Sequence, residues 1–242
     1  MAVLRYVVFG VGFGLRRSSF SADRIRLIGP AALKSQDLRP RTGFRWGPHA
    51  QQQVSMSKLP QSTALILIDV QQAFLDPRWG ERNNRDAESK IAQLLSAWRK
   101  SGRPVRHVVH DSVEANSLLR PESPGNAIQA VATPTATEPL YRKHVNSAFI
   151  GTSLEKDLRH DGIDTLVLVG LTTNHCVSTS ARMAGNLGFT TFVVSDATAT
   201  FARAALDGTL RSADAVHSAA LSDLHQEFAT VVDTAEILRR AA

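Results

Sequence analysis

The chain contains one cysteine, Cys176, among its 242 residues. A single thiol excludes an internal disulfide framework and any metal site built from several cysteines. The apolar stretch at residues 7–15 is shorter than the ~20 residues that span a bilayer, so no membrane partner is expected. With 43% hydrophobic and 21% charged residues, the composition is that of an ordinary globular protein with one sizeable core.

Acidic residues are scarce in the first 55 residues, which hold nine lysines and arginines against two acids. The formal charge of +6 therefore belongs to this segment, because residues 56–242 carry a balance of −1. A nearly neutral main domain argues against a nucleic-acid partner. Residues 1–55 also show no sustained helical or alternating period, which predicts a basic, disordered extension ahead of a domain at 56–242.

Two interpretations of this extension remain open. Its Arg-rich, acid-poor composition is typical of organelle transit peptides, whereas an upstream extension with Met56 as the working start explains it equally well. Arg16 and Arg17 follow the apolar stretch instead of preceding it, which argues against a secretory signal. We favour the upstream extension and a cytoplasmic location, with an organelle as the alternative.

From residue 63 onward, apolar runs alternate with segments of helical period. The predicted strands cover residues 63–70, 104–110, 138–145, 164–171, 190–197 and 228–232, and the predicted helices cover 87–102, 152–162, 174–188, 209–226 and the last residues of the chain. A long polar loop fills residues 111–138. This order predicts a Rossmann-like, three-layer α/β/α domain with a mostly parallel six-stranded sheet.

Two residues with reactive side chains follow buried strands. Asp69 ends the run ALILID, and Cys176 lies just past the strand at 164–171, in the expected first turn of a helix. A helix N-terminus or a nearby cation lowers the pKa of a thiol and activates it. Each residue also has a plain interpretation, Asp69 as a turn acid and Cys176 as a small buried apolar residue. If the two strands are neighbours where the strand order reverses, both side chains face one crevice.

Three motifs resemble those of the isochorismatase-like cysteine hydrolases. They are the D-x-Q of Asp69 to Gln71 with Phe74, the K-x-x-x-S-A-F of Lys143 to Phe149, and the G-x-x-T-x-x-C-V of Gly170 to Val177. The resemblance covers residues 62–233 and is strongest to the branch of N-carbamoylsarcosine amidohydrolase and ureidoacrylate hydrolase. It implies a homo-oligomer that acts on a small molecule.

The resemblance implies that Asp69, Lys143 and Cys176 form a catalytic triad that hydrolyses a C–N bond through a thioester. It also implies a cis peptide bond between Leu171 and Thr172, which turns the Thr172 N–H toward the Cys176 N–H to form an oxyanion hole. A small amide, carbamoyl or ureido compound is the expected substrate. The alternatives are a vinyl ether hydrolase that does not need the thiol, and a binding protein or redox sensor on the same scaffold.

No metal and no cofactor are expected. Nicotinamidases, a related branch, carry a D-x-H with a further histidine for a metal, and the segment HVVHDSVEANS has no D-x-H. Five residues are predicted to contact substrate: Gln71, Phe74, Trp79, His110 and Phe149. For the aromatic residues plain core packing is the alternative, and for His110 a buried hydrogen-bonded histidine. His175 adjoins the cysteine on a helix, where neighbouring side chains point about 100° apart, so it is a poor candidate for the base.

Overall fold

The computed structural model describes residues 58–242, so the expectations for residues 1–55 and for Met56 lie outside the described residues. Within residues 58–242, no helix is both long and apolar enough to cross a membrane.

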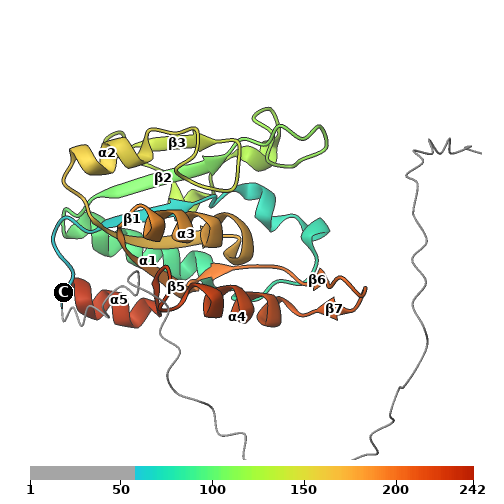
Figure 1. Ribbon diagram of the computed structural model, residues 1–242. Coiled ribbons are helices and arrows are strands. Elements are labelled where there is room, and N and C mark those ends of the chain that lie inside the picture. The colour runs from blue at the N-terminus through green and yellow to red at the C-terminus, as the bar shows by residue number, and fades with distance from the viewer. Residues whose placement is uncertain (1–57) are drawn as a thin grey trace, which may run out of the picture. The chain divides into compact units, whose positions relative to one another are not determined.

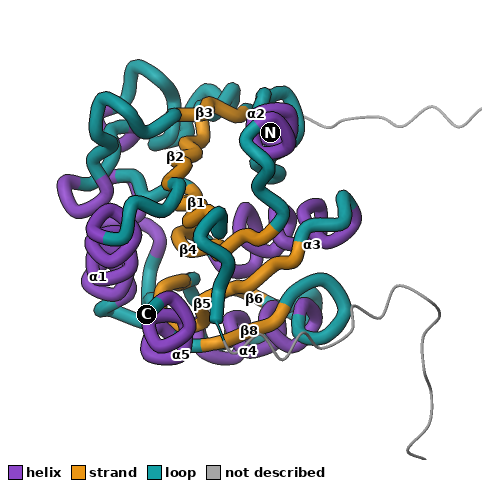
Figure 2. The backbone as a smooth tube through the Cα atoms, turned by 90° about the vertical axis from the view of Figure 1, so that its left-hand side faces the viewer, coloured by secondary structure: helices purple, strands orange, loops and turns teal. Residues whose placement is uncertain are grey.

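The predicted six-stranded sheet is confirmed, and all of its strand pairs are parallel. Its strands are β1 (Ala64–Ile68), β2 (Val105–His110), β3 (Leu140–Lys143), β4 (Thr165–Leu171), β5 (Thr190–Ala199) and β8 (Thr230–Val232), in the order β3-β2-β1-β4-β5-β8. Figure 1 shows the ribbon, and Figure 2 shows the strands following one another across the sheet. The central strands β1 and β4 are buried throughout, as continuous apolar runs predict.

Helices cover both faces of the sheet. The helices are α1 (Ala87–Lys100), α2 (Leu154–His160), α3 (Ser178–Asn186), α4 (Ala213–Leu224) and α5 (Thr234–Ala241). Figure 2 shows α1 and α5 on one face and α2, α3 and α4 on the other. Alternate side chains of β1 separate accordingly, because Leu65 and Leu67 pack with α1 and α5, whereas Ile66 and Ile68 pack with α2, α3 and α4.

Residues 203–211 differ from the prediction, because a hairpin precedes the helix that was expected from residue 209. Strands β6 (Arg203–Ala204) and β7 (Leu210–Arg211) pair antiparallel. The Asp207 carboxylate accepts hydrogen bonds from the Thr209 amide and hydroxyl at 2.9 and 2.7 Å, and Gly208 has a φ of 84°. These features close a turn, and Ser212 then caps α4 by accepting from the Ala215 amide.

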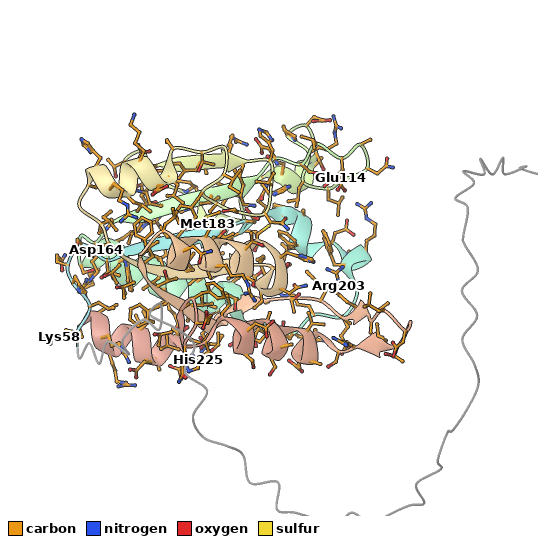
Figure 3. All side chains as sticks on the ribbon, viewed as in Figure 1. Lys58, Glu114, Asp164, Met183, Arg203 and His225 are labelled. Atoms are coloured by element: carbon orange, nitrogen blue, oxygen red, sulfur yellow. The ribbon has the colours of Figure 1, made fainter. Side chains whose placement is uncertain are left out.

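The strand order reverses between β1 and β4. The chain moves from β1 outward to β2 and β3, and then returns to the other side of β1 with β4. Ligands of open parallel sheets bind beyond the carboxyl ends of the strands at such a point. Figure 3 shows Lys58 and Asp164, which precede β1 and β4, at one end of the sheet, and Glu114 and Arg203 at the other.

Gly170 allows the two central strands to approach closely at this point. Its φ is 118°, and a Cβ atom there would lie 2.0 Å from the carbonyl oxygen of Ile68. No side chain fits at that distance, so the backbones of β1 and β4 are in direct contact just before the residues that follow the two strands.

We therefore expect Gly170→Ala to lower the free energy of unfolding by about 3 kcal/mol or more, since the backbone must shift to relieve the clash. Gly102→Ala is the matched control, because Gly102 also has a positive φ (67°) but its Cβ would meet nothing within 4 Å. That variant should lose only the ~1–2 kcal/mol of a left-handed alanine. Denaturant unfolding measures both values, and equal losses would contradict the close-approach argument.

Candidate active site

Asp69, Lys143 and Cys176 come from three strand ends. Asp69 directly follows β1 in a left-handed conformation with a φ of 51°, and Lys143 is the last residue of β3. Cys176 lies in a π-helical turn, Thr173–Val177, between β4 and α3. Because β1 and β4 are neighbours at the reversal, the acid and the thiol lie close together there, with ligand atoms within 4.8 Å of each other.

The Lys143 ammonium is the centre of the site. Its Nζ atom lies 2.7 Å from Asp69 Oδ2, 3.0 Å from His110 Nδ1 and 3.3 Å from Cys176 Sγ. An ammonium has three hydrogens, and each meets one acceptor here. Because Nδ1 of His110 accepts, this imidazole is neutral; burial and the charge of Lys143 lower its pKa.

Water is excluded from the charged groups. The side chains of Asp69 and Lys143 are 0% exposed, and Cys176 is 8% exposed. Removing one member of a buried ion pair lowers the free energy of unfolding by about 3–5 kcal/mol, because the other charge stays buried without a partner. Asp69 and Lys143 are therefore coupled in stability as well as in geometry.

The thiol of the free protein is not acidic. Burial raises the pKa of Cys176, and the Asp69 carboxylate raises it further, while the Lys143 ammonium opposes both effects. Burial also raises the pKa of Asp69, against the influence of Lys143. The lowering of the thiol pKa that a helix N-terminus or a nearby cation would produce is therefore not found, because burial, which the sequence does not show, raises the pKa more than Lys143 lowers it.

The two oxygens of the Asp69 carboxylate differ in their surroundings, because Oδ2 accepts from Lys143 and the carboxylate also interacts with the Cys176 thiol. Within residues 58–242, Oδ1 of Asp69 makes no hydrogen bond, although the atom is buried. Ligand atoms of Asp69, His110 and Cys176 lie within 4.8 Å of one another. A buried acceptor without a donor is costly, so this oxygen is suited to receive a proton or to bind a substrate N–H group.

Asp69, His110 and Cys176 are also ligand types that suit a metal ion such as zinc. The Lys143 ammonium contacts all three of these side chains and so competes with a metal for them. The absence of a catalytic metal stays a prediction.

The peptide bond between Leu171 and Thr172 is cis, as the resemblance predicted. It directly precedes the π-helical turn, and the carbonyl oxygen of Thr172 accepts hydrogen bonds from the amides of His175 (3.1 Å) and Val177 (3.3 Å). The turn that carries the thiol is thereby fixed to the end of β4. The oxyanion hole formed by the Thr172 and Cys176 amides stays a prediction.

Gln71 does not have the environment expected of a substrate contact. It is 0% exposed, and its amide group bonds to the backbone: Oε1 accepts from the His110 N–H (2.9 Å), and Nε2 donates to the carbonyl oxygens of His110 (3.1 Å) and Asn126 (2.8 Å). These bonds hold His110 against Lys143. Gln71 thus positions His110 through the backbone of that histidine.

The aromatic residues divide into two groups. Phe74, Trp79 and Phe201 form a cluster beyond the carboxyl end of the sheet, with ring centroids 5.4 to 6.4 Å apart. Phe149 instead stacks on Phe189, which precedes β5 at the amino end of the sheet, with centroids 5.9 Å apart. Phe149 therefore belongs to the core, its alternative interpretation, while Trp79, 39% exposed, can border a substrate.

Sequence reasoning missed Asn146. Its Oδ1 lies 3.7 Å from Cys176 Sγ and accepts the S–H hydrogen bond. Its place, three residues after Lys143 in the loop that follows β3, was the available signal, because such loops border the crevice. His175, by contrast, points to Arg203, in agreement with the expectation that it does not act as the base.

Comparison with known proteins agrees with the geometry. A family model described as the isochorismatase domain matches residues 63–236. The isochorismatase family protein YrdC of Bacillus subtilis is 45% identical over 180 residues, covering 74% of this chain and 96% of that protein. Nicotinamidase 3 of Arabidopsis thaliana is 33% identical over 185 residues, covering 76% of this chain and 81% of that protein.

A solved structure of an isochorismatase-family protein from Chromobacterium violaceum aligns with a TM-score of 0.73 and 45% identity, covering 75% of this chain and 94% of that one. The fold, the family model and these relatives agree over the same region of the chain. The chain belongs to the isochorismatase family of hydrolases.

Proposed function

We propose that this protein is a cysteine hydrolase that cleaves a C–N bond of a small amide, carbamoyl or ureido compound through a thioester, without a metal. The contact of a buried carboxylate, ammonium and thiol at the strand reversal carries this proposal. This set of groups supplies a nucleophile, a base and a fixed positive charge, which acyl transfer requires.

In the first step, Asp69 takes the thiol proton as the sulfur attacks the substrate carbonyl carbon. The ionised Asp69 and Lys143 carry no net charge together, and after the transfer the thiolate replaces the carboxylate beside the ammonium. The raised thiol pKa is compatible with this step, because the proton moves to a neighbouring group instead of leaving for solvent. The amides of Thr172 and Cys176 would stabilise the oxyanion that forms.

In the second step, the protonated Asp69 gives its proton to the leaving nitrogen as the C–N bond breaks. The acyl group remains on Cys176 as a thioester. Asp69 then removes a proton from water, the resulting hydroxide attacks the thioester, and the thiol is regenerated when its sulfur leaves with that proton. One carboxylate thus serves as base and acid in turn, which suits its raised pKa.

The relatives support amide chemistry without identifying the substrate. Nicotinamidase 3, by its name, acts on an amide. The segment HVVHDSVEANS of this chain has no D-x-H, so we place the protein nearer to the carbamoyl and ureido hydrolases than to the nicotinamidases.

The substitution Cys176→Ser should lower kcat/KM for amide substrates about 10⁴-fold or more, because it removes the nucleophile. Asp69→Asn should have an effect of similar size, since it removes the base. Release of ammonia or amine from a library of small amides, carbamoyl compounds and ureides measures this. Thermal unfolding shows whether each variant is folded, and His175→Ala serves as a control that should retain activity.

The same two substitutions separate amide hydrolysis from vinyl ether hydrolysis. A vinyl ether hydrolase would keep its activity in Cys176→Ser and lose it in Asp69→Asn. That result would overturn the thioester proposal.

The pH profile of kcat/KM should fall at acidic pH, and it should show no transition near neutral pH that comes from the thiol. Asp69 must be ionised to act as base, so kcat/KM should fall as the pH drops through its pKa, which lies above the ordinary 3.8. Because the thiol pKa lies above 9.0, alkylation of Cys176 in the free protein should still be rising at pH 9. A thiol that reacts fully at pH 6 would contradict this assignment.

A further inference from the structure

The thiol of the free protein has the side-chain oxygen of Asn146 as a hydrogen-bond acceptor. The Asn146 side chain belongs to the loop between β3 and α2 and is exposed. Its Oδ1 accepts the Cys176 S–H at 3.7 Å, while the sulfur itself accepts from Lys143 at 3.3 Å. Both hydrogen-bonding functions of the thiol are therefore occupied before any substrate is bound.

Two oxygens are thus available to one proton. Asn146 Oδ1 accepts from the thiol at 3.7 Å, and the Asp69 carboxylate, within 4.8 Å of the sulfur, also interacts with the thiol by hydrogen bonding, which works against the rise in the pKa of Asp69 that burial causes. Of the two acceptors Asn146 has the better geometry, because Oδ1 of Asp69 has no donor at hydrogen-bond geometry within residues 58–242. An amide oxygen is too weak a base to remove a thiol proton, so the bond to Asn146 keeps the sulfur as a thiol. The thiol must turn its hydrogen toward Asp69 before it can attack.

We propose that Asn146 is a substrate-reading residue that controls when this turn happens. An N–H group of the substrate replaces the thiol as the donor to Asn146 Oδ1, and the released S–H group then donates to Asp69 Oδ1. The proton passes from sulfur to that oxygen as the carbon–sulfur bond forms, so no further reactant is needed. This inference rests on the proposed function and assigns a selectivity to the same site.

The exchange requires an N–H group close to the carbonyl that reacts. Primary and secondary amides, carbamoyl compounds and ureides carry such a donor, whereas the ester of a simple carboxylic acid does not. A compound without this donor cannot replace the thiol at Asn146 Oδ1, so the S–H group stays bonded to Asn146 and is not transferred to Asp69. Asn146 therefore favours nitrogen compounds over esters, although esters are chemically easier to cleave.

The first test needs no substrate. The rate of Cys176 modification by methyl methanethiosulfonate, which has no N–H group, reports the state of the thiol in the free protein. Asn146→Ala should react about 2- to 10-fold faster than wild type, the range that the loss of one hydrogen bond allows. Asn146→Asp, of nearly the same shape, keeps an acceptor and adds a negative charge, which raises the thiol pKa, so it should react more slowly than wild type.

Val145→Ala is the matched control, because Val145 is the preceding residue and is 44% exposed. Its modification rate should equal that of wild type. Opposite effects of the two Asn146 variants support the inference, since a merely structural disturbance would move both rates in one direction. Equal shifts in Asn146→Ala and Asn146→Asp, or no shift in either, would overturn it.

The second test compares the best amide from the library with the methyl ester of the same acid. Asn146→Ala should lower kcat/KM for the amide about 10-fold and change that for the ester less than 3-fold, as the loss of one substrate hydrogen bond predicts. Equal losses for both compounds would overturn the inference. If the proposed function itself is wrong, the Cys176→Ser variant keeps full activity. The amide and ester activities of Asn146→Ala do not depend on that result, so the two failures can be distinguished.

Discussion

A single ammonium group, that of Lys143, holds the reactive part of this protein together. It bonds at once to the carboxylate of Asp69, the imidazole of His110 and the sulfur of Cys176, at 2.7, 3.0 and 3.3 Å. Its side chain and that of Asp69 are fully buried, so their mutual attraction has to offset the loss of two hydration shells. The surrounding structure must hold these groups at contact distance, and the strands β1, β3 and β4 position them.

The supports for this contact come from the backbone around the strand reversal. Gly170 lets β1 and β4 approach closely, the positive φ of Asp69 turns the chain directly after β1, and Gln71 fixes His110 through its N–H and C=O groups. On the other side, the turn that carries Cys176 is hydrogen-bonded to the carbonyl of Thr172. The reactive side chains therefore lie at the ends of strands or in the turn that follows one, while Asn146, which we propose contacts the substrate, lies in the loop between β3 and α2.

The sheet and the positions of Asp69 and Cys176 were predictable from the sequence, because buried parallel strands are long apolar runs and their carboxyl ends gather at one edge. The thiol pKa was not, since desolvation depends on everything that packs around the sulfur. The directions of the Gln71 and Phe149 side chains could not be predicted from the sequence either, because loop dihedral angles decide where these side chains point. Asn146 lay inside a recognised motif, yet only the path of its loop brings it to the thiol.

The contacts of Lys143 join parts of the chain that are far apart in sequence, 74 residues from Asp69 and 33 residues from Cys176. Three different strands, including the two that meet at the reversal, must be in register before these atoms can touch. A partly assembled or misregistered sheet can be compact and rich in secondary structure and still lack the site. Recovery of catalysis after denaturation would thus report completion of the native topology, which a spectroscopic signal from helices alone does not distinguish from an earlier state.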